Sequence, residues 1–394
     1  MLLNASPAQG NKRISADFEA MTRRSHSKMR RLITLYALLL AYLSLYPFHF
    51  AAPTAPVEPA WSRSDMLANV LAFIPLGVLL RAWAERQFTN AARAMSWMLL
   101  AAVAFAALLQ WLQVFVPGRS ASLMDIGMNM IGVALGASLL VLAHWSGWSR
   151  YLLPLARQPE GWLLLFWLLH QLAPFIPMVP DKTWRLLVYQ WTQMTFDPAL
   201  LLAETLGWAL MFRLIDPISL LARRLAPLVL LLSAFVWANG LQPEELLGLL
   251  LAYAVYWGRQ YWSLRWLLLL VLGYWLWRTL LPWQWLDTRQ PFYWMPFASL
   301  MHVPIAFAIQ QSLAKLFWLA AMFYLGSLWP VARRYWLLYL LVVLALIESL
   351  QLFLPRHAAE TTDAVLLLGL AFGWYQLERL DRQQTKSVAP GFRQ

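Results

Sequence analysis

The feature that most constrains this fold is a succession of apolar stretches separated by short segments that hold basic residues. Each stretch could cross a hydrocarbon core of about 30 Å as a helix, some of them tilted. Twelve such stretches run roughly over 32–46, 66–82, 95–116, 123–143, 162–177, 199–215, 226–239, 244–258, 266–281, 313–329, 335–354 and 362–377. Segment 297–310 is predicted either to span or to lie in the interface. We therefore expect an all-α, polytopic transmembrane helical bundle.

The composition excludes several other classes of protein. The chain has 394 residues, of which 61% are hydrophobic and 13% charged, whereas a soluble domain has about 25% charged residues. The absence of cysteine excludes disulfides, thiolate metal sites and a cysteine nucleophile. The histidines lack metal-ligand spacing and no phosphate-binding loop appears. We predict no metal and no cofactor.

The net charge of +12 reflects membrane topology and not nucleic-acid binding. If the N-terminus is cytoplasmic and the chain crosses twelve times, 23 of the 31 Lys and Arg residues lie on the cytoplasmic side. This distribution satisfies the positive-inside rule with both termini cytoplasmic. Residues 1–31 are predicted to be a basic cytoplasmic arm, and 379–394 a cytoplasmic tail. Membrane lipids are the expected partners.

Polar side chains interrupt two of the first apolar stretches. Asp65 and Asn69 are one helical turn apart, as are Asp125 and Asn129, so each pair shares a helix face. Such groups are expensive in a bilayer and often functional. The commoner reading needs no ligand: Asp125 is then a helix N-cap that pairs with Arg119, and Asn129 an interhelical hydrogen bond.

Two stretches of the chain carry the same pattern at a long period. In each, a helix ends in a polar pair, a Pro-Arg turn follows, and the next helix opens with Asp and contains Gly-xxx-Gly. The residues are Gln110, Gln113, Arg119, Asp125, Gly132 and Gly136 in the first copy, and Glu348, Gln351, Arg356, Asp363, Gly369 and Gly373 in the second. Residues 162–258, with Asp197, Glu244 and Glu245, are interpreted as a third, worn copy.

These motifs resemble the VanZ-like family of membrane proteins. The matching positions are Asp65, Asn69, Phe73, Pro75, Gly77, Gln113, Arg119, Asp125, Asn129, Gly132 and Gly136, with Gln110 where the family has Glu. The second copy keeps Glu348, Gln351, Arg356 and Asp363 but lacks the D-x-x-x-N helix and has Leu367 for the second Asn. The resemblance implies four-helix modules over 32–143 and 261–378, with a degenerate middle module over 144–260.

The resemblance also implies a bacterial cytoplasmic-membrane protein linked to resistance against glycopeptides such as teicoplanin. Our first hypothesis is a protein that binds or shields an amphiphilic envelope component, a lipid-linked glycan or a glycopeptide at the outer leaflet. The candidate ligand-binding residues are Asp65, Asn69, Gln113, Arg119, Asp125, Asn129, Glu348, Gln351, Arg356 and Asp363. Arg119 and two helix N-termini suit an anionic group.

Two alternatives stay open at this point. About twelve spans in repeated units are typical of a transporter or flippase, although the polar residues cluster near one face. An intramembrane enzyme with Glu348 as general acid or base ranks third, because no paired carboxylate motif supports it. We therefore lean against an enzyme.

Smaller patterns give further expectations about packing and charge. The Gly132/Gly136 and Gly369/Gly373 pairs are predicted to let helices approach closely. Gly77 beside Pro75 is predicted to permit a kink. Lys182 and Arg185 are interpreted as solvated loop charges, and Lys315 as a side chain that reaches lipid phosphates.

Overall fold

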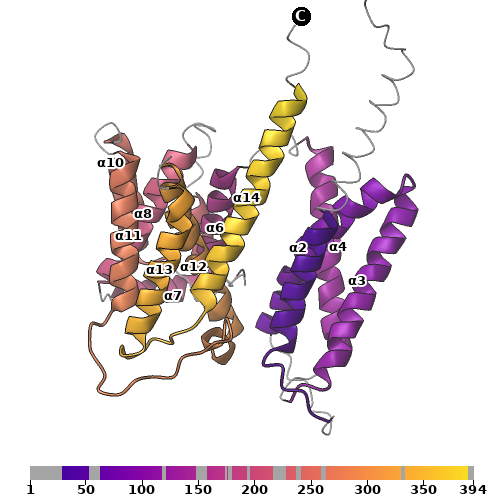
Figure 1. The fold of residues 1–394 in the computed structure, drawn as a ribbon, viewed down its shortest axis with the longest axis horizontal. Coiled ribbons are helices and arrows are strands. Elements are labelled where there is room, and N and C mark those ends of the chain that lie inside the picture. Colours follow the sequence, from indigo (N-terminus) through magenta and orange to yellow (C-terminus); the bar gives the residue numbers. More distant parts are fainter. Residues whose placement is uncertain are drawn as a thin grey trace, which may run out of the picture. The chain divides into compact units, whose positions relative to one another are not determined.

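The regular secondary structure in the described part of the computed structural model is helical (Figure 1). The described residues are 29–52, 63–117, 121–147, 158–173, 175, 180–192, 196–215, 228–236, 241–258, 263–329 and 333–388. No strand occurs within them. The chain divides into two compact units, Met1–Tyr151 and Leu152–Gln394. The expectation of an all-α protein is confirmed.

The first unit is built from a helix over 29–45 followed by α2 (Arg63–Gln87), α3 (Ala91–Gln113) and α4 (Leu123–Trp145). Helices α2 and α4 make the most extensive contact of the unit, and α3 contacts both. Phe73 and Leu76 of α2, Met98 of α3 and Val133 of α4 form its apolar core. Asn90 caps α3 by accepting hydrogen bonds from the backbone N–H groups of residues 92 and 93, which fixes the turn after α2.

Helices α2, α3 and α4 are long and apolar enough to cross a membrane. Their segments Asp65–Gln87, Ala91–Gln113 and Leu123–Trp145 have 23 residues each and mean hydropathies of 1.7, 1.8 and 2.0. At 1.5 Å per residue, each spans about 35 Å, which exceeds the hydrocarbon core of about 30 Å. Leu100, Trp111 and Leu139 are exposed on them, as expected of surfaces that face lipid.

The second unit contains more helices, several of them shorter than those of the first unit. Their bounds are α6 (Pro159–Leu172), α7 (Pro180–Thr192), α8 (Pro198–Ile215), α10 (Pro243–Trp257), α11 (Leu264–Leu280), α12 (Ile305–Ser327), α13 (Arg333–Gln351) and α14 (Thr362–Val388). A short helix covers 228–233, and a 3-10 turn, Ser299–His302, precedes α12. The ring of Trp167 meets that of Trp208 edge-on and that of Phe317 at a tilt within the core, so large rings join α6, α8 and α12.

Fewer described helices have both the length and the hydropathy of a membrane span than the sequence predicts. Within the described residues, only the three helices of the first unit meet the full length and hydropathy requirement, and Tyr335–Gln351 is a shorter apolar helix. Helix α6 has 14 residues and α10 has 15, which corresponds to about 21–23 Å. Twelve spans therefore stay a prediction.

Several local expectations were wrong. Lys182 and Arg185 lie on helix α7, not in a loop, because residues 180–192 form an amphipathic helix. Segment 297–310 contains the 3-10 turn at 299–302 and then the first residues of α12, so it is no separate spanning helix. Ser122, and not Asp125, caps α4: its Oγ accepts from the backbone N–H of Met124 at 3.1 Å. Asp125 lies in the first turn.

The glycines of the first unit hold α2 and α4 close together. A Cβ on Gly132 would lie 2.2 Å from the carbonyl oxygen of Val70, and one on Gly136 2.1 Å from that of Ile74. Gly77 serves the same approach, since its Cβ would lie 2.2 Å from the Val133 oxygen. Its predicted role in a kink beside Pro75 stays a prediction.

The glycine pair of the second unit behaves differently. Gly369 and Gly373 have nothing within 4 Å of a built Cβ, so the predicted close approach at these two positions is wrong. The small-xxx-small spacing is the same in both units. Only a neighbouring helix at contact distance turns that spacing into a packing requirement.

Candidate functional site

The polar residues predicted in the first unit meet where α2 and α4 begin. Asn69 Nδ2 donates a hydrogen bond to Asp125 Oδ1 at 2.9 Å, across the close contact that the glycines allow. Asp65 lies in the first turn of α2 and is exposed, near enough to Asp125 for the two carboxylates to repel each other. Asn129 is buried, and its Oδ1 accepts no hydrogen bond from the described residues.

The two glutamines at the end of α3 form hydrogen bonds with backbone groups. Gln110 is buried and its Oε1 accepts from the backbone N–H of Ser122 at 2.9 Å. Gln113 Nε2 donates to the carbonyl oxygen of Ser44 at 3.0 Å. These bonds tie the start of α4 and the end of the helix over 29–45 to α3. Arg119 falls outside the described residues, so its predicted pairing with Asp125 stays a prediction.

A charged cluster lies in the second unit between α12 and the start of α14. Lys315 Nζ lies 2.7 Å from Asp363 Oδ1 and 3.6 Å from Glu360 Oε1. The side chain of Glu360 is 1% exposed and that of Asp363 11%, whereas Lys315 keeps 33%. Buried charges require such partners because their desolvation costs several kcal/mol each. The expectation that Lys315 reaches lipid phosphates gives way to this ion pair.

Glu348, at the end of α13, adds a third carboxylate to this cluster. Its Oε2 accepts from the backbone N–H of Glu360 at 2.7 Å. Glu360 Oε2 in turn accepts from the backbone N–H of Ser299 at 3.1 Å. The ammonium group of Lys315 thus pairs with two carboxyl groups, and the third, that of Glu348, is bonded to the backbone of Glu360. We refer to Lys315, Glu348, Glu360 and Asp363 as the carboxylate cluster.

The remaining predicted residues of the second copy lie beside this cluster. Gln351 is buried and donates through Nε2 to the carbonyl oxygen of Thr279 at 3.0 Å. Arg356 is exposed with φ of 65°, and no described acidic side chain pairs with it. The neighbouring His357 bonds through Nε2 to the carbonyl oxygen of Leu281. Arg356 therefore shapes a turn and is not brought into the cluster.

The same hydrogen bonds recur in both units. The Gln110–Ser122 bond corresponds to Glu348–Glu360, and the Gln113–Ser44 bond to Gln351–Thr279. In addition, the backbone N–H of Ala51 donates to Phe115 oxygen, and that of Leu286 to Phe353 oxygen, both at 2.8 Å. The pair Asn69–Asp125 has its counterpart in Lys315–Asp363. Thus the amides of Asn69 and Gln110 in the first unit correspond to the charged groups of Lys315 and Glu348 in the second.

A backbone feature also recurs after three helices. Phe48, Phe175 and Trp283 have φ of 62°, 65° and 60°, a region that large residues seldom adopt. Each backbone N–H donates to the carbonyl oxygen three residues earlier, in Leu45, Leu172 and Leu280. Each aromatic residue also follows a proline in the sequence.

The sequence reasoning missed the contacts of three charged groups, of which Glu204 and Glu360 are buried and Lys315 is one-third exposed. Glu204 of α8 is 3% exposed and accepts from Gln171 Nε2 and from Trp208 Nε1 at 3.0 Å or less. A carboxylate inside the apolar stretch 199–215 was the available signal. Glu360 stands twelve residues after Glu348, as Ser122 does after Gln110. Lys315 gave no signal of a partner, because its acidic partners are more than 40 residues away in sequence.

Within the described residues, no group of three or more His, Asp and Glu side chains has an arrangement that could hold a metal ion. The carboxylate cluster contains hydrogen-bond acceptors and one ammonium donor. Helices of membrane length, with buried polar groups at their ends, define the class of the chain. Three described helices that are long and apolar enough to span a membrane indicate a helical membrane protein.

The comparison with family models then specifies the first unit. Residues 14–144 match the family described as VanZ/LLP1, so the chain carries a VanZ-like domain. This match covers the helix over 29–45 together with α2, α3 and α4, and it confirms the resemblance for the first copy. No curated protein and no solved structure matches the chain.

Proposed function

We propose that this protein acts in the bacterial cell envelope and binds the polar part of an amphiphile at the carboxylate cluster. The supporting observation is the surplus of acceptors around Lys315: Asp363 at 2.7 Å, Glu360 at 3.6 Å and Glu348 beside Glu360. A cluster built only for stability needs one carboxylate for one ammonium group, because each further buried charge adds a desolvation cost. Costly polar groups in a membrane protein mark functional sites by default.

The chemistry of this cluster favours a ligand rich in donors. Carboxylates accept hydrogen bonds from hydroxyl and amino groups, and Lys315 supplies a donor that is one-third exposed. Sugars and glycopeptides present many such hydroxyl and amino groups. We therefore propose a lipid-linked glycan or a lipoglycopeptide antibiotic as the ligand, which agrees with the glycopeptide link that the VanZ-like domain suggests.

We also propose that the chain consists of three related modules. The recurring hydrogen bonds, and the recurring aromatic residues with positive φ, support modules at 32–143, 144–260 and 261–378. Twelve spans would follow from three such modules of four helices. Both termini would then lie in the cytoplasm, with the carboxylate cluster and the Asn69–Asp125 pair near the outer face of the cytoplasmic membrane.

A flippase for a lipid-linked precursor is the second candidate. Transporters are often built from internal repeats, and the recurring hydrogen bonds favour such repeats. Buried Glu204 lies along α8, away from the helix ends, where a transport path needs polar groups. Its carboxylate already accepts bonds from Gln171 and Trp208, so we rank binding first.

The proposed binding is tested with Glu348→Gln in the purified full-length protein. Gln110 makes the corresponding backbone bond in the first unit, so a glutamine at 348 keeps that bond while removing one carboxylate. Teicoplanin is added in increasing amounts, and its binding is followed by the change in tryptophan fluorescence. The matched control is Glu85→Gln, which removes an exposed carboxylate on α2. We expect Glu348→Gln to bind teicoplanin more weakly than the wild type, and Glu85→Gln to bind it equally well. Equal affinities for the wild type and both variants would overturn the proposal.

A further inference from the structure

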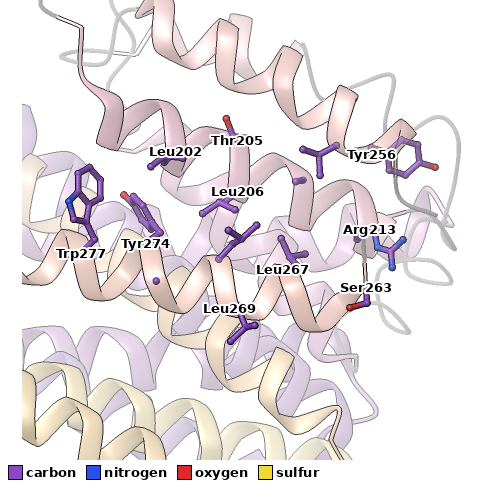
Figure 2. A pocket seen from close by; sticks show the side chains of 14 residues that line it. Leu202, Thr205, Leu206, Arg213, Tyr256, Ser263, Leu267, Leu269, Tyr274 and Trp277 are labelled. Atoms are coloured by element: carbon purple, nitrogen blue, oxygen red, sulfur yellow. The ribbon is translucent and has the colours of Figure 1, made fainter. Parts of the chain in front are cut away.

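An elongated cavity lies among α8, α10 and α11 (Figure 2). Its volume is about 370 Å³, within the range of ligand pockets. Leu202, Leu206 and Ala209 of α8, Val255 of α10, and Leu267 and Leu270 of α11 form much of an almost wholly apolar wall. None of the carboxylate cluster lines it. The shape and lining suit a hydrocarbon chain.

One end of this cavity is cationic. Figure 2 shows Arg213 and Ser263 at one end, with Tyr274 and Trp277 at the other. No described acidic side chain pairs with the Arg213 guanidinium. The exposed Arg265 follows Ser263 on α11. A positive charge at the mouth of an apolar cavity complements an amphiphile whose head is anionic.

Further arginines occur in the sequence next to α8 and α11. Arg223 and Arg224 occur in the segment that follows α8, and Arg259 in the segment that precedes α11. These three arginines fall outside the described residues. Basic segments next to membrane helices attract anionic lipid head groups. The expected cytoplasmic location of these arginines agrees with that attraction.

The cavity has an exposed position of α11 in its wall. Gly273 lines it, is exposed, and has nothing within 4 Å of a built Cβ. A chain of surrounding lipid could enter from this side without displacing a described side chain. A larger residue at 273 would occupy part of the opening without a clash in the protein.

We propose that this cavity binds an acyl chain of an anionic phospholipid, with the phosphate at Arg213. The site is separate from the proposed glycan or glycopeptide site and uses none of its residues. The lipid would fill the space among three helices and couple α8 to α11.

The test is native mass spectrometry of the full-length protein in neutral detergent, with phosphatidylglycerol or phosphatidylcholine of identical chains added. We expect the wild-type protein to bind phosphatidylglycerol more tightly. Gly273→Leu should weaken binding of both lipids about tenfold, because displacing roughly two methylenes from the cavity removes their contribution. Arg213→Gln should weaken binding of phosphatidylglycerol more than binding of zwitterionic phosphatidylcholine, whose phosphate carries a compensating choline, and so abolish most of the preference.

The matched control is Gly369→Leu, which adds the same side chain to an exposed helical glycine that also has nothing within 4 Å. It should bind both lipids as the wild type does. Equal lipid binding by Gly273→Leu and Gly369→Leu would overturn the cavity assignment. A preference retained by Arg213→Gln would overturn the phosphate assignment. Because Glu348→Gln leaves this cavity intact, its lipid binding separates this proposal from the proposed function.

Discussion

The ammonium group of Lys315 lies 2.7 Å from Asp363, at the position where the first unit pairs Asn69 with Asp125 at 2.9 Å. The first contact joins α2 to the first turn of α4. The second joins α12 to the first turn of α14. The first unit uses a neutral amide and the second an ion pair. This exchange of amide for charge, repeated at Gln110 and Glu348, distinguishes the second cluster chemically from the first.

Removing the ammonium group should destabilise the second unit. Lys315→Met leaves two buried carboxylates without their cation, and we expect a loss of about 3 kcal/mol, the lower end for a broken buried pair because Lys315 is one-third exposed. Thermal unfolding in detergent measures the loss. Adding Asp363→Asn and Glu360→Gln should recover much of it. An unchanged melting temperature for Lys315→Met would contradict the ion pair.

Glycines of equal spacing should respond differently to the same substitution. Gly132→Leu forces α2 and α4 apart, because its Cβ alone would lie 2.2 Å from the Val70 oxygen. We expect a loss of folded protein, or at least about 3 kcal/mol of stability. Gly369→Leu meets open space and should be neutral or slightly stabilising. Fluorescence-detected size exclusion compares the two, and similar losses would refute the difference in packing.

The hydrogen bond between Asn69 and Asp125 should appear as a coupling energy. In a double-mutant cycle of Asn69→Ala and Asp125→Ala, we expect about 0.6–2 kcal/mol, as for polar contacts between membrane helices. Unfolding in detergent supplies the four stabilities. Strict additivity would show that the contact, though 2.9 Å long, adds nothing to stability.

Corresponding glutamines should have similar effects in the two units. Gln113→Ala and Gln351→Ala each remove a bond to a backbone carbonyl, of Ser44 and Thr279, and we expect about 1 kcal/mol for each. Gln311→Ala, at an exposed position of α12, is the control and should change stability little. A large loss for one glutamine and none for its counterpart would argue against common modules.

Much of the fold follows from the apolar runs, because a helix in a membrane must satisfy its own backbone hydrogen bonds. The start of α4 near Asp125 and of α14 near Asp363 was also predictable, since a carboxylate favours the first helical turn. Helix α7 was not predicted: residues 180–192 are amphipathic and lack a long apolar run. Charge alone made Lys182 resemble a loop residue.

The candidate site could be predicted only in part. The repeated spacing identified Glu348, Gln351 and Asp363, but repetition reveals only what the copies share. Lys315 and Glu360 have no like residue in the first unit, where Asn69 and Ser122 stand. Their meeting depends on how α12 lies against α14, and long-range packing of that kind leaves no local pattern. The same limit applies to Arg356, whose side chain the turn leaves exposed.

The most direct test of the central claim compares Glu348→Gln with Glu85→Gln in cells that lack the native protein. Folded abundance in the membrane and sensitivity to glycopeptides and envelope stress are measured together. The account predicts normal abundance for both variants and lost protection only for Glu348→Gln. Full protection by Glu348→Gln at normal abundance would contradict the assignment of the carboxylate cluster as a binding site.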